Sequence, residues 1–168
     1  NIDSVTKYQD YVKRAQELNM TALAFSEHGS VFDWHGKKEA IEKTGMKYIH
    51  AAEFYITEKI DTDESGNPIK LRDNWHCLLI AKNFDGVKEI NRLASKSFNR
   101  KDGHYYYAPR VELNDILNTS DNVVISSACL GGILNRASEE VQKQFLDFMV
   151  QHKDRCFLEI QHHDVYDQ

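Results

Sequence analysis

The stretch that decides the fold reads Ala-Leu-Ala-Phe-Ser-Glu-His-Gly-Ser and runs from Ala22 to Ser30. Its apolar beginning ends abruptly in an acid, a histidine and a glycine. Buried strands of α/β barrels end in this way, because functional side chains gather at the carboxyl ends of the strands. The stretch therefore predicts a buried strand that delivers His28 to one mouth of such a barrel.

The same pairing of an apolar run with a potential metal ligand recurs three times. Glu53 and Cys129 each close an apolar run, and His76 stands just before one. Histidine, carboxylate and thiolate ligands suit Zn²⁺, and mixed histidine and carboxylate sites also accept Mn²⁺ or Fe. The wide spacing excludes a zinc finger, whose ligands come as close pairs, and favours a site built from successive strands.

Each of these four residues also has an ordinary explanation. His28 could be a loop residue, Glu53 a paired surface acid, His76 an edge-strand residue and Cys129 a small buried hydrophobe, the commoner role of free cysteine. His76 fits a metal site least well, because it begins its strand while the others end theirs. A ligand there requires this strand to start near the site, or the polar loop before it to fold back.

The bulk composition is that of a single globular domain. The 168 residues are 41% hydrophobic and 28% charged, with a net charge of -5. This charge is not typical of a nucleic-acid binder, although neighbouring domains can supply a basic groove. No apolar run approaches the roughly 18 residues that span a membrane. Three widely spaced cysteines argue against a disulfide framework and favour a reducing cytoplasm.

Hydrophobic periodicity predicts strands that alternate with helices, and hence a parallel sheet. About five β-α units are expected, fewer than a complete eight-unit barrel of roughly 250 residues holds. We therefore expect one domain, 1–168, that is an incomplete barrel from a longer chain, with a polar surface insertion at 58–74. The expected strands are 21–25, 46–57, 75–81, 123–127 and 157–161, and the expected helices are 4–18 (capped by Asp3 or Ser4), 31–43, 85–98, 111–117, 131–135 and 138–152.

A loop over residues 99–110 interleaves basic and aromatic side chains, which is a composition that can clamp phosphates and stack on bases. Lys101, His104 and Arg110 are its candidate substrate-binding residues. The alternative is that the tyrosines pack on the barrel rim and the cations are solvated. At the C-terminus, one histidine of the run 162–164 could add a metal ligand.

Other chemistries find little support. There is no Gly-rich phosphate loop and no G-x-S-x-G elbow, so serine hydrolysis is unsupported. Cys129 could act as a nucleophile, but no base for it can be placed.

Six ordered motifs resemble those of the PHP (polymerase and histidinol phosphatase) domain family, and specifically the N-terminal PHP domains of bacterial DNA polymerase III alpha subunits. Ser26 to Ser30 resembles the family's Thr-Asp-His-Gly-Asn motif, and the resemblance runs from about Tyr11 to His163. The remaining motifs read AEFYI from Ala52, WHCLLIAKN from Trp75, YYAPRV from Tyr106, SSACLGG from Ser126 and FLEIQ from Phe157.

This resemblance implies a distorted (β/α)7 TIM-like barrel of the PHP type with up to three divalent metal ions, Zn or Mn, at one mouth. By motif, His28, Glu53, His76 and Cys129 inherit the role of metal ligands, and Glu27 that of orienting His28. The family's opening H-x-H motif is expected to precede Asn1, and its closing D-x-H motif is expected to follow Gln168. The catalytic residues stay unassigned.

The resemblance further implies a part of a replicative DNA polymerase, with DNA, the remaining polymerase domains and other replisome subunits as partners, in the cytoplasm and away from membranes. The site itself is a metal-dependent phosphoesterase or 3′–5′ exonuclease in complete relatives. The alternatives are a stand-alone PHP phosphatase and a catalytically decayed scaffold module.

Overall fold

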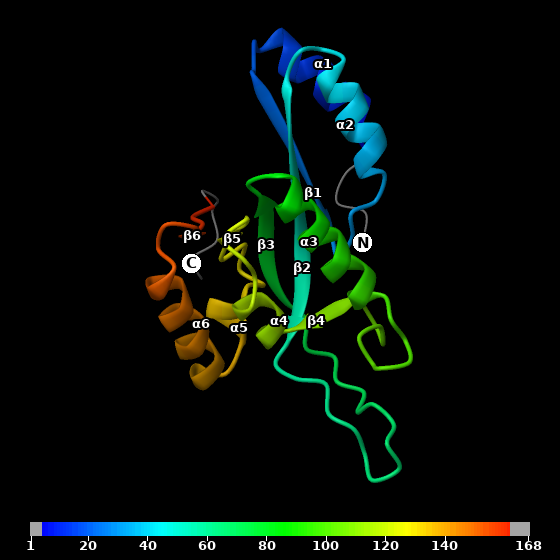
Figure 1. Ribbon diagram of the computed structural model, residues 1–168, viewed down its shortest axis with the longest axis vertical. Coiled ribbons are helices and arrows are strands. Elements are labelled where there is room, and N and C mark those ends of the chain that lie inside the picture. The colour runs from blue at the N-terminus through cyan, green and yellow to red at the C-terminus, as the bar shows by residue number, and fades with distance from the viewer. Residues whose placement is uncertain (1–4, 162–168) are drawn as a thin grey trace.

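The structure, a computed structural model, describes residues 5–161 and shows a mixed sheet with helices (Figure 1). The strands are β1 (Ala22–His28), β2 (Lys47–Thr57), β3 (Trp75–Ala81), β4 (Arg110–Glu112), β5 (Val123–Ser126) and β6 (Cys156–Phe157). The helices are α1 (Tyr8–Glu17), α2 (Trp34–Glu42), α3 (Phe84–Ser97), α4 (Leu113–Leu117), α5 (Ile133–Arg136) and α6 (Glu139–Gln151).

The strand order is β1-β2-β3-β5-β6, and β4 pairs with the end of β2. The prediction of a parallel sheet holds for the pairs β1–β2, β2–β4 and β5–β6. It is wrong for β3, which runs antiparallel to both β2 and β5. The physical reason is the connection from β2 to β3. Residues 58–74 form no crossover helix, and a loop that returns directly lets the next strand pair antiparallel. The sheet formed by the described strands is open, so a closed barrel is not seen in this part of the chain.

One face of the sheet carries the main hydrophobic core. Alternate residues of β2 and β3 point to this face, where Phe54, Ile56, Cys77 and Leu79 are almost fully buried. Residues of α3 and α6 complete the same cluster, among them Ile90 and, at the centre of α6, Phe145. Because successive side chains of a strand alternate between faces, the residues between these positions lie on the opposite face. Glu53 and His76 belong to that opposite face.

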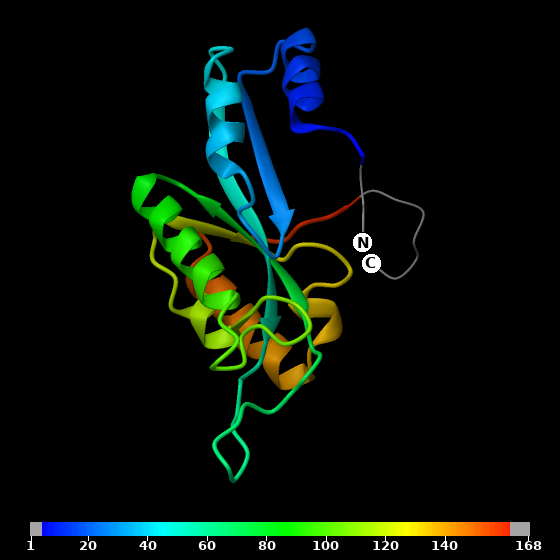
Figure 2. The ribbon, with the colours of Figure 1, turned by 90° about the vertical axis from the view of Figure 1, so that its right-hand side faces the viewer.

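A smaller core lies at the other end of the molecule. Val12 and Ala15 of α1 pack with Ile41 of α2 and with Met46, against the helix-facing side of β1 and β2. Figure 2 shows α1 and α2 beside β1, at the end of the molecule away from the loop 58–74.

The loop 58–74 protrudes from the end of β2 and is largely exposed (Figure 1). A turn at Asp63 to Gly66 reverses it, and Thr62 bridges Pro68. Its return arm is attached to the body by Arg110, which is described with the site.

Most predicted elements are present, with shifted ends. The first strand extends to His28 rather than ending at Phe25. The first helix begins at Tyr8 with Lys7 as its N-cap, and the predicted caps Asp3 and Ser4 lie outside the described residues. The last strand is confined to β6, so the prediction of a strand over residues 158–161 is wrong.

Candidate metal site

Strand register brings three of the four predicted ligands to one place on the open face. His28 of β1 lies directly beside Glu53 of β2. His76 of β3 is paired with Tyr55, two residues further along β2. Because β3 is antiparallel, its first residues lie at the edge where β1 ends and β2 carries Glu53. The antiparallel direction of β3 therefore places its first residues at the site. A metal ligand at position 76 requires this arrangement, because His76 begins its strand.

The Glu53 carboxylate is at the centre of the cluster. Its Oε1 lies 2.9 Å from Nδ1 of His28 and 2.9 Å from Nδ1 of His76. Burial alone would raise the pKa of Glu53. Hydrogen bonding and charge from His76, with a further contribution from His28, outweigh that effect and hold the pKa of this carboxyl below its ordinary value. Glu53 is therefore held as the anion, the form that binds metal.

Cys129 reaches the cluster from the loop after β5. Its Sγ lies 3.2 Å from Nδ1 of His76. The loop is held by the amide of His76, which donates to the carbonyl of Gly131 at 2.9 Å. A Cβ at Gly131 would lie 3.0 Å from the His76 ring, so glycine lets the loop come this close. Ala128 adopts a left-handed conformation with φ 58°, which turns the chain sharply ahead of Cys129.

Glu53, His76 and Cys129 each offer a ligand atom, and these atoms lie within 4.8 Å of one another. His28 is not part of this group of three, although it contacts Glu53 and its ring lies 6.2 Å from the His76 ring. Carboxylate oxygen, imidazole nitrogen and thiolate sulfur form a donor set that suits Zn²⁺. These residues fit a divalent metal ion.

The other two cysteines are separated from the site by the sheet. Cys77 and Cys156 belong to the main core on the helix-covered face. Burial raises the pKa of both thiols and keeps them protonated. Cys129 is thus the cysteine that the fold sets apart from the core.

Glu27 does not orient His28, and that expectation needs correction. Neighbouring residues on a strand point to opposite faces, so Glu27 faces the helices while His28 faces the cluster. There the Glu27 carboxylate pairs with Nζ of Lys37, a buried lysine of α2. This ion pair attaches α2 to β1.

Two of the three predicted substrate-binding residues are buried. The Arg110 side chain donates to the carbonyls of Leu71 at 2.7 Å and Gly103 at 3.3 Å, and to the carboxylate of Asp73 at 3.3 Å. Nδ1 of His104 lies 3.1 Å from the Arg110 carbonyl. The Arg110 side chain therefore holds the loops 58–74 and 99–110 together, whereas His104 braces the loop 99–110 internally. The burial of both side chains disfavours direct contact with a DNA strand. Lys101 is exposed, and its role stays a prediction.

The sequence reasoning missed Tyr55, whose ring lies 5.1 Å from the His76 ring and is stacked at 6.5 Å on that of His28. A signal was available, because Tyr55 shares the face of Glu53 by alternation. A recess of about 320 Å³ beside His76 also includes Arg136, which no motif had marked. The predicted ligands of the run 162–164 lie outside the described residues.

The comparisons with known proteins identify the family of this chain. A family model described as "PHP domain" matches residues 1–163, and the chain therefore belongs to the PHP domain family. The family predicted from the motifs is confirmed. No helix between residues 5 and 161 is both long and apolar enough to cross a membrane.

Curated relatives of this chain include DNA polymerase III alpha subunits. The chain is 28% identical over 177 residues to that of Borreliella burgdorferi and 29% identical over 179 residues to that of Aquifex aeolicus. In both cases the match covers 99% of this chain but 15% of the relative, so the chain spans a small part of their length. A solved structure of a candidate metal-dependent phosphoesterase from Bifidobacterium adolescentis matches 93% of this chain and 82% of its own, with a TM-score of 0.48 and 13% identity.

Proposed function

We propose that this chain is the PHP domain of a replicative DNA polymerase alpha subunit, and that its cluster holds divalent metal ions for phosphoester hydrolysis of the 3′–5′ exonuclease type. The observation that carries the metal assignment is the approach of Glu53, His76 and Cys129 within 4.8 Å of one another. The polymerase assignment is supported by relatives that match 99% of the chain.

Each residue has a distinct part in the proposed site. His76 and Cys129 supply nitrogen and sulfur ligands, and Glu53 supplies an oxygen ligand. His28 is proposed as a further ligand, since its Nδ1 already lies 2.9 Å from Glu53. These residues would hold a divalent ion, whose chemistry would be to polarise a phosphoryl oxygen and to lower the pKa of a water molecule. Zn²⁺ and Mn²⁺ are the proposed ions, because they accept this donor set.

The remaining features of the family belong to the same proposal. Closure into a PHP-type barrel would require further strands beside β1 and β6, the outermost strands of the described sheet. DNA, the rest of the polymerase and other replisome subunits are the proposed partners, in the cytoplasm. Lys101 is proposed to contact the DNA strand from the rim of the loop 99–110. Nucleotidyl transfer is proposed for the parent chain, outside these residues.

The test uses the complete polymerase chain and its His76→Ala variant. The unmodified enzyme should contain Zn²⁺ or Mn²⁺ by mass spectrometry and release nucleotides from the 3′ end of a labelled primer. The variant should lose both properties while it still extends the primer. A matched control is His35→Ala, which removes an exposed histidine of α2. Equal metal content and 3′-end release in the His76→Ala variant would refute the proposed site.

A further inference from the structure

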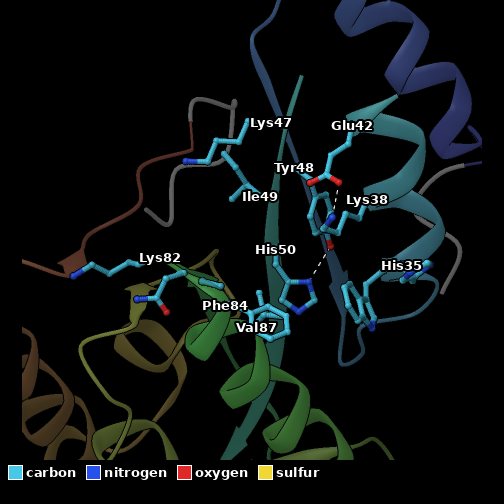
Figure 3. A pocket seen from close by; sticks show the side chains of 13 residues that line it. His35, Lys38, Glu42, Lys47, Tyr48, Ile49, His50, Lys82, Phe84 and Val87 are labelled. Atoms are coloured by element: carbon cyan, nitrogen blue, oxygen red, sulfur yellow. Dashed lines mark hydrogen bonds and ion pairs between the residues drawn. The ribbon is translucent and has the colours of Figure 1, made fainter. Parts of the chain in front are cut away.

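A second recess lies at the beginning of β2, away from the metal cluster. Its volume is about 640 Å³ (Figure 3). Side chains from α2, β2 and the start of α3 line it, including Trp34, Tyr48, His50 and Lys82. Tyr48 and Glu53 are separated by about 17 Å along the strand, at roughly 3.3 Å per residue. The recess is therefore distinct from the proposed metal site.

The recess exists because β3 separates from β2. Pairing of β2 with β1 starts at Lys47, whereas its described register with β3 starts at Ala51, opposite Ile80. Beyond β3 the chain turns toward β5, and the amide of Lys82 donates to the carbonyl of Asn122 at 2.8 Å. Residues 47–50 thus have a neighbouring strand on one edge alone within the described residues.

The main chain of this segment can accept another strand. The amide of Lys47 donates to the carbonyl of Thr21 at 2.9 Å, so its polar groups point toward the β1 side. Backbone polar groups alternate along a strand, and those of Tyr48 therefore point toward the opposite, open edge. Such an edge is a template for pairing with an extended segment.

The two sides of the edge differ in chemistry. Figure 3 shows Tyr48 and His50 pointing to one side of β2, and Lys47, Ile49 and Lys82 pointing to the other. The first side is mainly aromatic, since the Trp34 ring lies edge-on to His50 with centroids 5.3 Å apart. The second side is mainly basic.

Charge around the recess is opposite in sign to the charge of the whole chain. Lys38, Lys47 and Lys82 line it, whereas Glu42 is the one acid among its 13 lining residues. That acid is paired with Lys38 in the same helix. In a chain of net charge -5, this local excess of cations favours an anionic partner.

We propose that this recess binds an extended acidic segment of a partner protein, which adds as a strand to the open edge of residues 47–50. Alternate side chains of the added strand would point to the two sides of β2. Acidic residues would face Lys47 and Lys82, and apolar residues would face Tyr48 and Trp34. The recognised pattern is therefore an alternation of acidic and apolar residues, independent of any metal at Glu53.

The test measures binding of a fluorescein-labelled peptide, VEVEVE, by fluorescence anisotropy. We expect saturable binding to this chain, and at least roughly tenfold weaker binding of VKVKVK, because its cations face lysines. Lys47→Glu with Lys82→Glu should reverse this preference. Lys13→Glu with Lys143→Glu changes the net charge equally at exposed positions elsewhere and should leave it intact. Absence of saturable VEVEVE binding up to about 1 mM would overturn the proposal. An unchanged preference for VEVEVE over VKVKVK in the variant that carries both Lys47→Glu and Lys82→Glu would also overturn it.

Backbone pairing is tested separately from charge. Peptide binding should slow hydrogen exchange at the Tyr48 amide, measured by NMR. N-methylation of alternate VEVEVE amides should abolish binding in one register and spare it in the other, because one set of amides faces β2. Equal effects of both methylation patterns would contradict strand addition. Displacement of the peptide by dATP with no protection of Tyr48 would assign the recess to a small anion instead and would also overturn the proposal.

Discussion

Nδ1 of His76 lies 3.2 Å from Sγ of Cys129, although 53 residues separate them in the sequence. The contact arises because β3 is antiparallel to β5. The beginning of β3 therefore lies beside the loop that follows β5, where His76 bridges Gly132. Glu53 is drawn into the same contact through Nδ1 of His76. Sheet topology, rather than any local motif, thus assembles the cluster.

Gly29 should tolerate no side chain, since it follows His28 in a left-handed conformation with φ 61°. A Cβ there would lie 2.9 Å from Cγ of Pro109 and 3.0 Å from the Tyr55 ring. We expect Gly29→Ala to lower the free energy of unfolding by about 2–3 kcal/mol in urea denaturation, from backbone strain and overpacking together.

Gly45→Ala is the matched control for this change. Gly45 also has a positive φ, 83°, but a Cβ there meets nothing within 4 Å. Its substitution should cost about 1 kcal/mol, the penalty of the left-handed conformation alone. Equal losses for the two variants would show that Pro109 and Tyr55 do not constrain the turn after His28.

Arg110 should hold the loop 58–74 against the body. Arg110→Met removes the donor to the carbonyl of Leu71 and the partner of Asp73. Because the side chain is almost fully buried, we expect a loss of about 3 kcal/mol in the free energy of unfolding. Limited proteolysis should also cut the loop 58–74 faster.

Arg100→Met, at an exposed arginine of the neighbouring loop, serves as the control. It should change neither the stability by more than about 0.5 kcal/mol nor the cleavage rate. If Arg110→Met were cut no faster than this control, the anchoring role of Arg110 would be wrong.

His50 should make stability depend on pH. Burial lowers the pKa of this imidazole, against an opposing hydrogen bond with Asn91. Its ring lies 2.9 Å from the Tyr48 hydroxyl and 3.1 Å from Oδ1 of Asn91, contacts that the neutral ring satisfies. A depressed pKa stabilises the folded state above the ordinary histidine pKa of about 6.5, and this contribution is lost as the pH falls below it.

The measurement is the free energy of unfolding between about pH 7.5 and pH 5 for the unmodified chain and for His50→Gln. The difference between the two should shrink toward acid, because below the ordinary histidine pKa the unfolded chain binds a proton at His50 that the folded chain does not. For His35→Gln, at an exposed histidine, the free energy of unfolding should depend on pH in the same way as that of the unmodified chain. A constant difference between the His50→Gln and unmodified curves would contradict the burial argument.

Much of the fold follows from local patterns. The apolar run before Glu53 and the helical spacing around Leu93 predict β2 and α3 almost to their ends. Strand direction was harder, because an apolar run reads the same in either direction. The absence of a helical pattern between residues 58 and 74 was the available sign that β3 would return antiparallel.

In the site, too, local patterns predict some features, while others depend on how distant segments pack. Ligand types and strand ends predicted which residues to consider, and the register then placed His28, Glu53 and His76 on one face. The burial of Arg110 could not be predicted from its loop, because its partners belong to the separate segment 71–73. The pairing of Glu27 with Lys37 likewise depends on how α2 packs on β1.

The most direct test of the proposed metal centre is Co²⁺ titration of the chain, followed by absorption spectroscopy. A thiolate-to-cobalt charge-transfer band should appear and saturate, because Cys129 lies among oxygen and nitrogen ligands. Cys129→Ser should abolish the band, while Cys156→Ala, at a core cysteine, should retain it. No charge-transfer band in the unmodified chain, or the same band after Cys129→Ser, would contradict the assignment of Glu53, His76 and Cys129 as a metal site.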